Sequence, residues 1–216
     1  MIQPSIEVIL SDLGNVILPF NHYQIPEKLA RYSPKEDQAA PSKIFSYLFD
    51  LHKGIVDAYE TGRLSSMEFY QSVRDFFDLQ ISFEEFIPIW NDIFTEDHEV
   101  SQLIRSFKGK KKLGLVSNTN PLHFDYALAR FPVLHVFDRW FLSHEVGFKK
   151  PAAEIFQRAI DWAAVGPERI VFVDDHERNV RAAVALGMHG VHFTSYQQLK
   201  EELNRRNCIP PKVLLK

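Results

Sequence analysis

The chain has 216 residues, of which 45% are hydrophobic and 25% are charged, so it can bury a full core and lies near the upper end of the size range of one domain. The formal net charge of -3 comes from mixed acidic and basic residues, which excludes the strongly basic surface by which proteins bind nucleic acid or an anionic membrane. The single cysteine, Cys208, excludes an internal disulfide, and no apolar stretch resembles a membrane span or a secretory signal, so we expect a cytoplasmic protein.

An apolar run that begins at Val8 predicts a short strand, which ends directly before Asp12 and so delivers one carboxylate. From about residue 21 to residue 97 the apolar residues recur at helical spacing, and we expect only helices there. Ser42 precedes an apolar segment that runs to Leu51 and is closed by Gly54. Two further helices should begin at capping boxes, Ser65 with Glu68 and Ser82 with Glu85, and the many aromatic residues of this stretch are expected to form a bundle core.

After residue 97 short apolar runs alternate with helical patterns, which is typical of βαβ units around a parallel sheet. We predict strands near 113–117, 139–143, 170–174 and 189–193 and helices near 98–108, 121–130, 152–163, 177–187 and 196–206. Gly109, Gly166 and Gly187 fall where helix ends favour a left-handed residue. The first strand has to join the same sheet, because its backbone groups would otherwise stay unpaired. The predicted fold is therefore α/β, a Rossmann-like core (1–20 and 98–216) with an inserted helical cap (21–97).

At four places polar residues follow a predicted strand or precede the next helix. These residues are Asp12, Ser117 with Asn118, Lys150, and Asp174 with Asp175. In open α/β sheets ligands bind at the carboxyl ends of the strands, so these groups should meet in one crevice. Several carboxylates close together require a cation or a shared proton, and Mg²⁺ is the natural cation for such hard oxygen ligands. Backbone N–H groups before the helix at Pro121 suit a phosphate, and Lys150 adds a positive charge.

Each of these residues also has a purely structural interpretation. Asp12 could only turn the chain, residues 117–120 could form a turn and an N-cap, Lys150 could precede a helix that starts with Pro151, and Asp175 could cap the next helix. All four together, in this order, favour a phosphoryl-transfer site with an aspartate nucleophile.

The order Asp-Leu-Gly-Asn, Ser-Asn-Thr-Asn, Lys-Pro and Asp-Asp resembles the four motifs of the haloacid dehalogenase superfamily over nearly the whole chain, including a helical cap after the first motif. Residues 117–123, 147–156 and 172–175, with Asn179 and Ala182, resemble more closely its sugar-phosphate phosphatases of the α-D-glucose-1-phosphate phosphatase type. The resemblance implies that Asp12 attacks phosphorus and forms an aspartyl-phosphate.

The same resemblance assigns the other roles. Mg²⁺ would be held by Asp12, by the backbone carbonyl of Gly14 and by an acid of the last motif, for which we favour Asp175 over Asp174. Ser117 and Asn118 would hold phosphoryl oxygens, and Lys150 would neutralise charge on the nucleophile and the phosphate.

Gly14 departs from the family pattern, because most phosphatases of the family have there a second Asp that protonates the leaving alcohol and then activates water. The loss of a general acid/base typically lowers a rate by about 10²–10⁴. We hypothesise that a leaving group of low basicity, such as an anomeric sugar hydroxyl, tolerates Gly14. His22 or His123 could instead transfer the proton, although either could be a surface or supporting histidine.

We therefore predict a Mg²⁺-dependent phosphatase of a small phosphorylated metabolite, such as the sugar phosphate glucose-1-phosphate, with no nucleic-acid or membrane partner. Two alternatives stay open. A haloacid dehalogenase also uses an Asp nucleophile without the second Asp, although a metal-free halide site gains nothing from Asp174 and Asp175. A non-catalytic protein of this fold could bind a phosphorylated ligand without hydrolysing it, although such a protein has no need of all four motifs. The physiological substrate and the oligomeric state cannot be predicted from the sequence.

Overall fold

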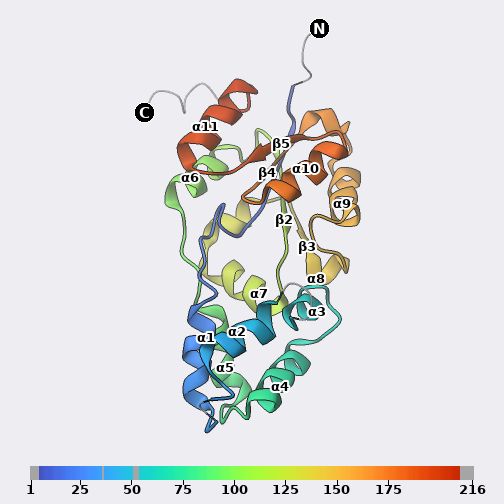
Figure 1. Cartoon of the computed structure of the whole chain (residues 1–216). Coiled ribbons are helices and arrows are strands. Elements are labelled where there is room, and N and C mark those ends of the chain that lie inside the picture. The colour runs from blue at the N-terminus through green and yellow to red at the C-terminus, as the bar shows by residue number, and fades with distance from the viewer. Residues whose placement is uncertain (1–4, 36, 51–53, 210–216) are drawn as a thin grey trace.

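A five-stranded parallel sheet lies at the centre of one half of the molecule (Figure 1). The structure is a computed structural model that describes residues 5–35, 37–50 and 54–209. The strands pair in the order β3-β2-β1-β4-β5, and every pair is parallel. Their bounds are Val8–Ser11 (β1), Lys112–Ser117 (β2), Arg139–Leu142 (β3), Ile170–Asp174 (β4) and His189–His192 (β5). The predicted α/β fold is confirmed, with the first strand in the middle of the sheet.

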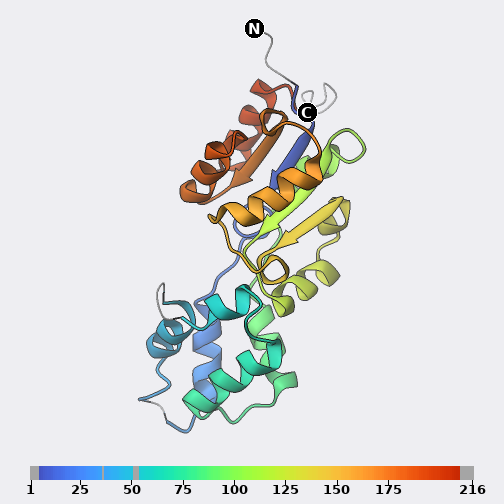
Figure 2. The same ribbon diagram turned by 90° about the vertical axis from the view of Figure 1, so that its right-hand side faces the viewer.

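Helices cover both faces of the sheet, because strand side chains point alternately to opposite sides. Ile9 and Val171 pack on one face with apolar residues of α6, α7 and α11, whereas Leu10 and Phe172 pack on the other face with residues of α9 and α10. Figure 2 shows α9 crossing one face of the sheet. The helices span His98–Ser106 (α6), Pro121–Arg130 (α7), Ala153–Ala163 (α9), Glu177–Ala185 (α10) and Tyr196–Arg205 (α11).

The strand order reverses beside β1, and this reversal positions the candidate site. The chain proceeds outward from β1 through β2 to β3 and then crosses to β4 on the other side of β1. Ser11 pairs with Val173, so the next residues, Asp12 and Asp174, end adjacent strands at the same level. A topological switch point of this kind leaves a crevice at the carboxyl ends of the two strands.

A second group of helices lies below the carboxyl edge of the sheet in Figure 1 and has its own apolar core. Trp90, Tyr59, Phe69 and Phe86 are fully buried there and contact one another through their rings. The elements are Gln24–Leu29 (α1), Ala30–Tyr32 (η1), Pro41–Phe49 (α2), Val56–Glu60 (α3), Ser66–Phe77 (α4) and Phe83–Asn91 (α5). They lie between β1 and α6 in the chain, within the predicted cap. The exact boundaries between cap and core stay predictions, and the first and last residues assigned to the core, 1–4 and 210–216, lie outside the described part.

Both predicted capping boxes are formed. The Ser65 hydroxyl accepts a hydrogen bond from Glu68 N, whose carboxylate accepts from Ser65 N, and Ser82 and Glu85 repeat this arrangement. Such a cap stabilises a helix start by about 1 kcal/mol.

Other sequence expectations need correction. Ser42 does not precede its helix: α2 begins at Pro41, whose missing N–H is not needed in the first turn. This helix ends at Phe49, and Leu51 lies outside the described residues.

Two of the three glycines behave as predicted. Gly109 and Gly187 have positive φ, but Gly166 has φ -61°. Ala164 takes the left-handed conformation in its place, because α9 already ends at Ala163.

Short elements without a helical period in the sequence were not predicted: α8 (Ser143–Val146), η2 (Pro132–Val136) and η3 (Pro167–Arg169). Within the described residues, no helix combines the length and the apolar character that crossing a membrane demands.

Candidate active site

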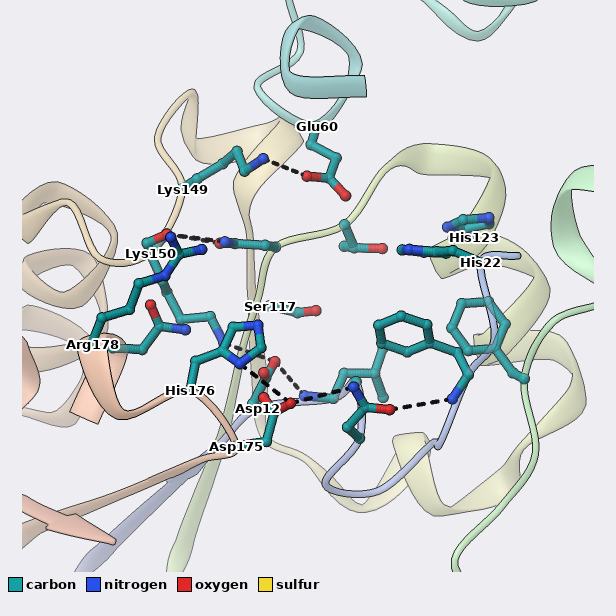
Figure 3. A pocket seen from close by; sticks show the side chains of 18 residues that line it. Asp12, His22, Glu60, Ser117, His123, Lys149, Lys150, Asp175, His176 and Arg178 are labelled. Carbon is teal, nitrogen blue, oxygen red and sulfur yellow. Dashed lines mark hydrogen bonds and ion pairs between the residues drawn. The ribbon is translucent and has the colours of Figure 1, made fainter. Parts of the chain in front are cut away.

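A cavity of about 210 Å³ lies between the carboxyl edge of the sheet and the α1–α5 helices (Figure 3). All six residues predicted for the site, Asp12, Gly14, Ser117, Asn118, Lys150 and Asp175, line this cavity. The structure therefore brings together groups that are separated by up to 163 residues in the sequence. The volume is below the range of roughly 300–1,000 Å³ of pockets for drug-sized ligands, which favours a small ligand.

Lys150 bridges two carboxylates at the bottom of the cavity. Its Nζ lies 2.7 Å from Asp12 Oδ1 and 2.7 Å from Asp174 Oδ2, and the three side chains are almost fully buried. Asp12 Oδ1 also accepts a hydrogen bond from Leu13 N at 2.6 Å. One carboxylate oxygen of Asp12 is therefore held by two donors, which orients the side chain.

Burial and charge act in opposite directions on this pair. Burial raises the pKa of Asp12 to about 7, with a further increase from Asp174, although the Lys150 charge lowers it. Burial alone would lower the pKa of Lys150, but the charges of Asp12 and Asp174 outweigh it and raise this pKa. Lys150 is therefore a firmly protonated cation, and Asp12 is a carboxylate that responds strongly to any additional positive charge.

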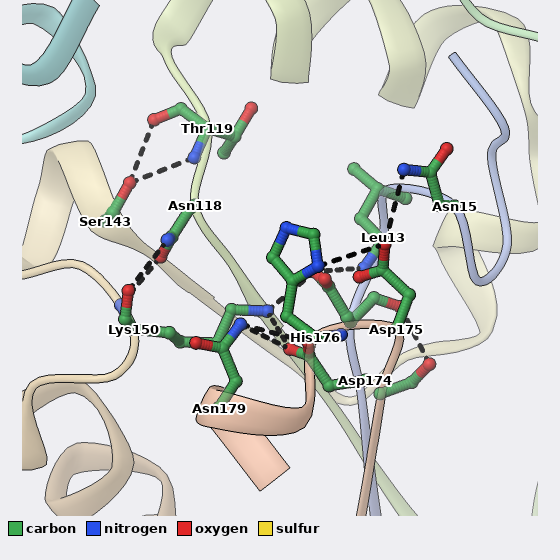
Figure 4. A network of polar contacts seen from close by, with 12 residues as sticks. Leu13, Asn15, Asn118, Thr119, Ser143, Lys150, Asp174, Asp175, His176 and Asn179 are labelled. Atoms are coloured by element: carbon green, nitrogen blue, oxygen red, sulfur yellow. Dashed lines mark hydrogen bonds and ion pairs between the residues drawn. The ribbon is translucent and has the colours of Figure 1, made fainter. Parts of the chain in front are cut away.

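Asp174 and Asp175 lie in different environments. Asp174 is fully buried, and its two oxygens accept hydrogen bonds from His176 N, Asn179 Nδ2 and Lys150 Nζ (Figure 4). Asp175 lines the cavity, and among the described residues its carboxylate has only two partners, Asn15 Nδ2 at 3.3 Å and His176 Nδ1 at 3.5 Å, both beside the same oxygen. Asp175 thus has carboxylate oxygen available for a ligand in the cavity, whereas the capacity of Asp174 is used by the protein.

The three carboxylates are suitably placed for a divalent cation. Asp12, Asp174 and Asp175 each offer one oxygen, and these oxygens lie within 4.8 Å of one another. Three ionised carboxylates beside one Lys150 cation leave an excess of two negative charges, which one Mg²⁺ would balance. Carboxylate, backbone carbonyl and amide oxygens are also the hard donors that Mg²⁺ prefers. The residues present therefore fit this cation by number, charge and chemistry.

Ser117 and Asn118 follow β2 but use their side chains differently. The buried Ser117 hydroxyl lines the cavity and has no hydrogen-bond partner among the described residues. The Asn118 amide donates to Lys150 O at 3.0 Å, and its carbonyl accepts from Lys150 N at 2.7 Å. Asn118 therefore holds the backbone of the Lys150 segment with its side chain, and only its backbone N–H remains as a donor for a ligand.

The ring of Phe20 occupies the space beside Gly14. A Cβ atom at residue 14 would lie 2.6 Å from Phe20 Cε1, far inside normal contact. Asn15 adopts φ 53°, and its carbonyl accepts a hydrogen bond from Phe20 N while its amide reaches Asp175. The turn after Asp12 therefore excludes a side chain at residue 14 and puts an aromatic edge there instead.

The two histidines considered for proton transfer differ clearly. His123 is buried with Nδ1 3.0 Å from Asn120 Nδ2 and Nε2 2.9 Å from Trp90 O, so both ring nitrogens are engaged. Burial lowers the pKa of His123 to about 3. The Asn120 amide is a donor and the Trp90 carbonyl is an acceptor, so the ring is a neutral Nε2–H tautomer that joins α5 to α7. This geometry leaves His123 no nitrogen for a substrate.

His22 also lines the cavity, half-buried, and burial lowers its pKa to about 4. Its ring is stacked on Phe49 with centroids 4.5 Å apart and lies 4.4 Å from the Phe20 ring. Neither ring nitrogen has a partner among the described residues. Of the two candidates, His22 is the one that can still contact a ligand.

An ion-pair cluster joins the helical part to the loop before Lys150. Lys149 Nζ lies 2.7 Å from Glu60 Oε2 and 3.3 Å from Asp57 Oδ1, both on α3. Glu60 and Lys149 line the cavity, and Figure 3 shows them above Ser117, on the side away from Asp12. The wall opposite the carboxylates is therefore polar but nearly balanced in charge.

Several residues of the site were not predicted from the sequence: Asn15, Phe20, Glu60, Lys149, Ser143 and Arg178. Ser143 accepts from Thr119 N and donates to Thr119 O, which fixes the chain after β2. A signal existed only for Asn15, because Asn is one of the few residues besides Gly that readily adopt the left-handed conformation in a turn. The other contacts join residues far apart in the sequence.

The chain is similar to known proteins in sequence and in fold. The sequence profile of haloacid dehalogenase-like hydrolases matches residues 6–187. D-ribitol-5-phosphate phosphatase of Bacteroides thetaiotaomicron is 32% identical over 157 residues, which cover 69% of this chain and 76% of that protein.

Two crystal structures of a haloacid dehalogenase family enzyme from Bacteroides thetaiotaomicron are similar to the whole fold. One has a TM-score of 0.77 at 25% identity, with 88% of this chain and 95% of that chain covered. The other is a complex with magnesium and inorganic phosphate and has a TM-score of 0.76 at 24% identity, with the same coverage. At this identity the second likeness shows the shared fold.

Proposed function

Because the chain belongs to the haloacid dehalogenase-like hydrolases, we propose that it is a Mg²⁺-dependent phosphatase whose substrate is a small phosphorylated sugar or sugar alcohol. The observation that carries the proposal is the Asp12–Lys150–Asp174 array beside Asp175, at the bottom of a small cavity. D-Ribitol 5-phosphate, taken from the relative above, and α-D-glucose 1-phosphate, taken from the sequence motifs, are the two candidate substrates.

Asp12 is the proposed nucleophile. Its carboxylate attacks phosphorus in line with the leaving oxygen; the bond between phosphorus and that oxygen breaks, the leaving oxygen takes a proton from water, and an aspartyl-phosphate forms. A water molecule then attacks phosphorus and gives up a proton to solvent, the bond to Asp12 breaks, and inorganic phosphate leaves. The Leu13 N–H and Lys150 Nζ hold one oxygen of Asp12, which leaves the other oxygen for the attack.

The remaining residues bind the phosphoryl group. The Ser117 hydroxyl has no partner among the described residues, so it can donate to a phosphoryl oxygen, and Asn118 contributes its backbone N–H. Lys150 neutralises charge on Asp12 and on the phosphate, and such preorganised donors act without reorganisation during the reaction. Mg²⁺ would be held by Asp12, the Gly14 carbonyl and Asp175. Asp174, which bonds to Lys150 and Asn179, would support this site without holding the ion directly. The bound ion would stabilise negative charge on the transferred phosphoryl group.

Two observations favour a phosphatase over the alternatives left open by the sequence. Three carboxylates with oxygens within 4.8 Å suit a cation, and a dehalogenase that works without metal gains nothing from them. The Ser117 hydroxyl and the buried Lys150 keep an anion-binding arrangement around Asp12, which a protein without turnover would not need beside a nucleophile.

Phosphate release from both candidate substrates tests the proposal. We expect release that requires Mg²⁺, stops with EDTA and vanishes in Asp12→Asn, with Asp161→Asn, an exposed residue of α9, as a matched control that stays active. Halide release from a 2-haloacid in EDTA would instead support the dehalogenase. Ligand binding without release from any phosphate ester would support the binding protein.

A further inference from the structure

The side chain of His22 has free hydrogen-bonding capacity inside the cavity. Its ring is fixed by Phe20 on one side and Phe49 on the other, and Figure 3 shows it at the wall opposite Asp12. No described residue is bonded to either nitrogen. Half-buried polar groups without protein partners lose free energy unless a ligand or water bonds to them.

His123 provides an internal comparison. Its ring centroid is 6.3 Å from that of His22 and nearly parallel to it, yet both of its nitrogens are bonded by Asn120 and Trp90. His123 thus serves packing, while His22 sits in the same stack with its nitrogens available. Of the two histidines, His22 is therefore the one whose ring nitrogens can bond to a ligand in the cavity.

The surroundings of His22 define which ligand groups suit it. A neutral imidazole has one donor and one acceptor, as has a hydroxyl group. The lowered pKa of His22 is consistent with the neutral form. Glu60 and Lys149, which also line the cavity, are paired with each other at 2.7 Å, so neither presents an unpaired charge to a ligand beside His22.

Apolar surface completes the wall. Phe20 and Phe94 line the cavity beside His22 and contact each other edge to face at 6.1 Å. Aromatic faces and edges accommodate the C–H groups of a sugar or polyol, whose hydroxyls then need polar partners. A neutral, hydroxylated carbon chain matches this combination better than a lipid or a second anionic group.

We propose that His22 is a specificity-determining residue that bonds the hydroxyl groups of the leaving alcohol, so that polyhydroxylated phosphate esters are preferred over plain alkyl phosphates. The inference rests on the proposed phosphatase function. Asp12 and Lys150 hold the phosphoryl end, and His22, on the opposite wall, meets the other end of the same substrate.

The test compares D-ribitol 5-phosphate with n-pentyl phosphate, which has the same number of carbons and an alkyl leaving group but no hydroxyls. We expect wild type to prefer the ribitol ester. His22→Phe, which keeps an aromatic ring in the stack, should lower kcat/KM for the ribitol ester about threefold to tenfold, the size of one or two neutral hydrogen bonds. Its kcat/KM for n-pentyl phosphate should stay within about twofold of wild type.

Two further variants exclude trivial explanations. His22→Gln keeps a hydrogen-bond donor and an acceptor but does not titrate, so it should retain part of the preference for the ribitol ester. This variant keeps the test possible if His22→Phe does not fold. His98→Gln changes a histidine that is exposed on α6, outside the cavity, and should behave like wild type.

Equal losses on both esters would overturn the inference, because packing or proton transfer by His22 would affect both alkyl leaving groups alike. Equal kcat/KM of wild type for the two esters would overturn it as well and leave the phosphatase intact. No release from either ester, with Mg²⁺ present, would overturn the proposed function itself.

Discussion

Gly14→Asp tests whether Phe20 is the reason that the acid/base carboxylate is absent. A Cβ at residue 14 would lie 2.6 Å from Phe20 Cε1 and 3.2 Å from Cδ1, whereas ordinary contact begins at 3.4 Å. The ring therefore has to retreat by about 0.8 Å, and overpacking of this kind costs about 1–3 kcal/mol. For a chain of this size each kcal/mol lowers Tm by about 2–4 °C. Gly14→Asp and Gly14→Ala should both melt roughly 2–12 °C below wild type.

Removal of the ring should make the carboxylate useful. In Phe20→Ala the space beside residue 14 opens, so Gly14→Asp added to it should cost little further stability. In its protonated form the new carboxyl group can then donate a proton to the leaving oxygen, and a general acid contributes about 10²–10⁴ in rate. We expect the double variant to hydrolyse an alkyl phosphate at least about tenfold faster than Phe20→Ala alone. Turnover of 4-nitrophenyl phosphate, whose leaving group needs no proton, should stay nearly unchanged.

Thermal unfolding and steady-state phosphate release with both esters measure the two effects separately. A Gly14→Ala protein that melts with wild type would refute the steric argument. A double variant that is no faster than Phe20→Ala on the alkyl ester, although it is folded, would refute the chemical argument. A rate increase in Gly14→Asp alone would show that Phe20 moves freely and does not exclude the carboxylate.

Two further predictions concern buried charge. Lys150→Met leaves Asp12 and Asp174 without their common cation. It should abolish phosphate release and lower the free energy of unfolding at pH 7 by about 3–5 kcal/mol. The loss of unfolding free energy should be smaller at pH 5, where Asp12 is protonated, and a loss that does not change with pH in urea titrations would contradict this reasoning. His123 is neutral with a pKa of about 3 against 6.5 when unfolded, so its contribution to stability is complete above pH 6.5 and is lost as pH falls toward 3, by about 1.4 kcal/mol per pH unit. His123→Gln should therefore show a shallower fall in unfolding free energy between pH 6.5 and 4.5 than wild type, and parallel curves would exclude the effect.

The fold was largely predictable because its signals are local. Most strands of the sheet are short apolar runs bounded by turn or helix residues, and each predicted strand agrees with the structure within one residue. The two capping boxes were recognisable for the same reason, since Ser65 and Ser82 act only three residues away. Where the sequence misled, at Gly166, the left-handed residue after α9 is Ala164, two residues earlier, and a glycine pattern cannot show this.

The site was predictable only in part. The phosphoryl half follows from strand ends and register, because β1 and β4 are neighbours and bring Asp12 level with Asp174. The difference between Asp174 and Asp175 depends on which carboxylate Lys150 and Asn179 bond to, and this is a matter of side-chain geometry. Asn118 was predicted to hold a phosphoryl oxygen, but the sequence could not show that its side chain bonds to the backbone of Lys150, 32 residues away, and leaves only the backbone N–H for a ligand.

The leaving-group half of the cavity has a different origin from the phosphoryl half. Phe20, His22 and Glu60 lie in the turn after Asp12 and in the inserted helices, and their positions depend on packing around Phe49 and on the ion pair with Lys149. Substitutions there change the wall without disturbing the strand ends, which the sheet holds in register. Selection among phosphate esters can therefore shift through these residues while Asp12 and Lys150 keep the same geometry. Phe20 occupies the space beside Gly14 and contacts the ring of His22. The absence of a carboxylate at residue 14 and the proposed recognition of the alcohol therefore depend on one aromatic wall, and variants of Phe20 should alter both together.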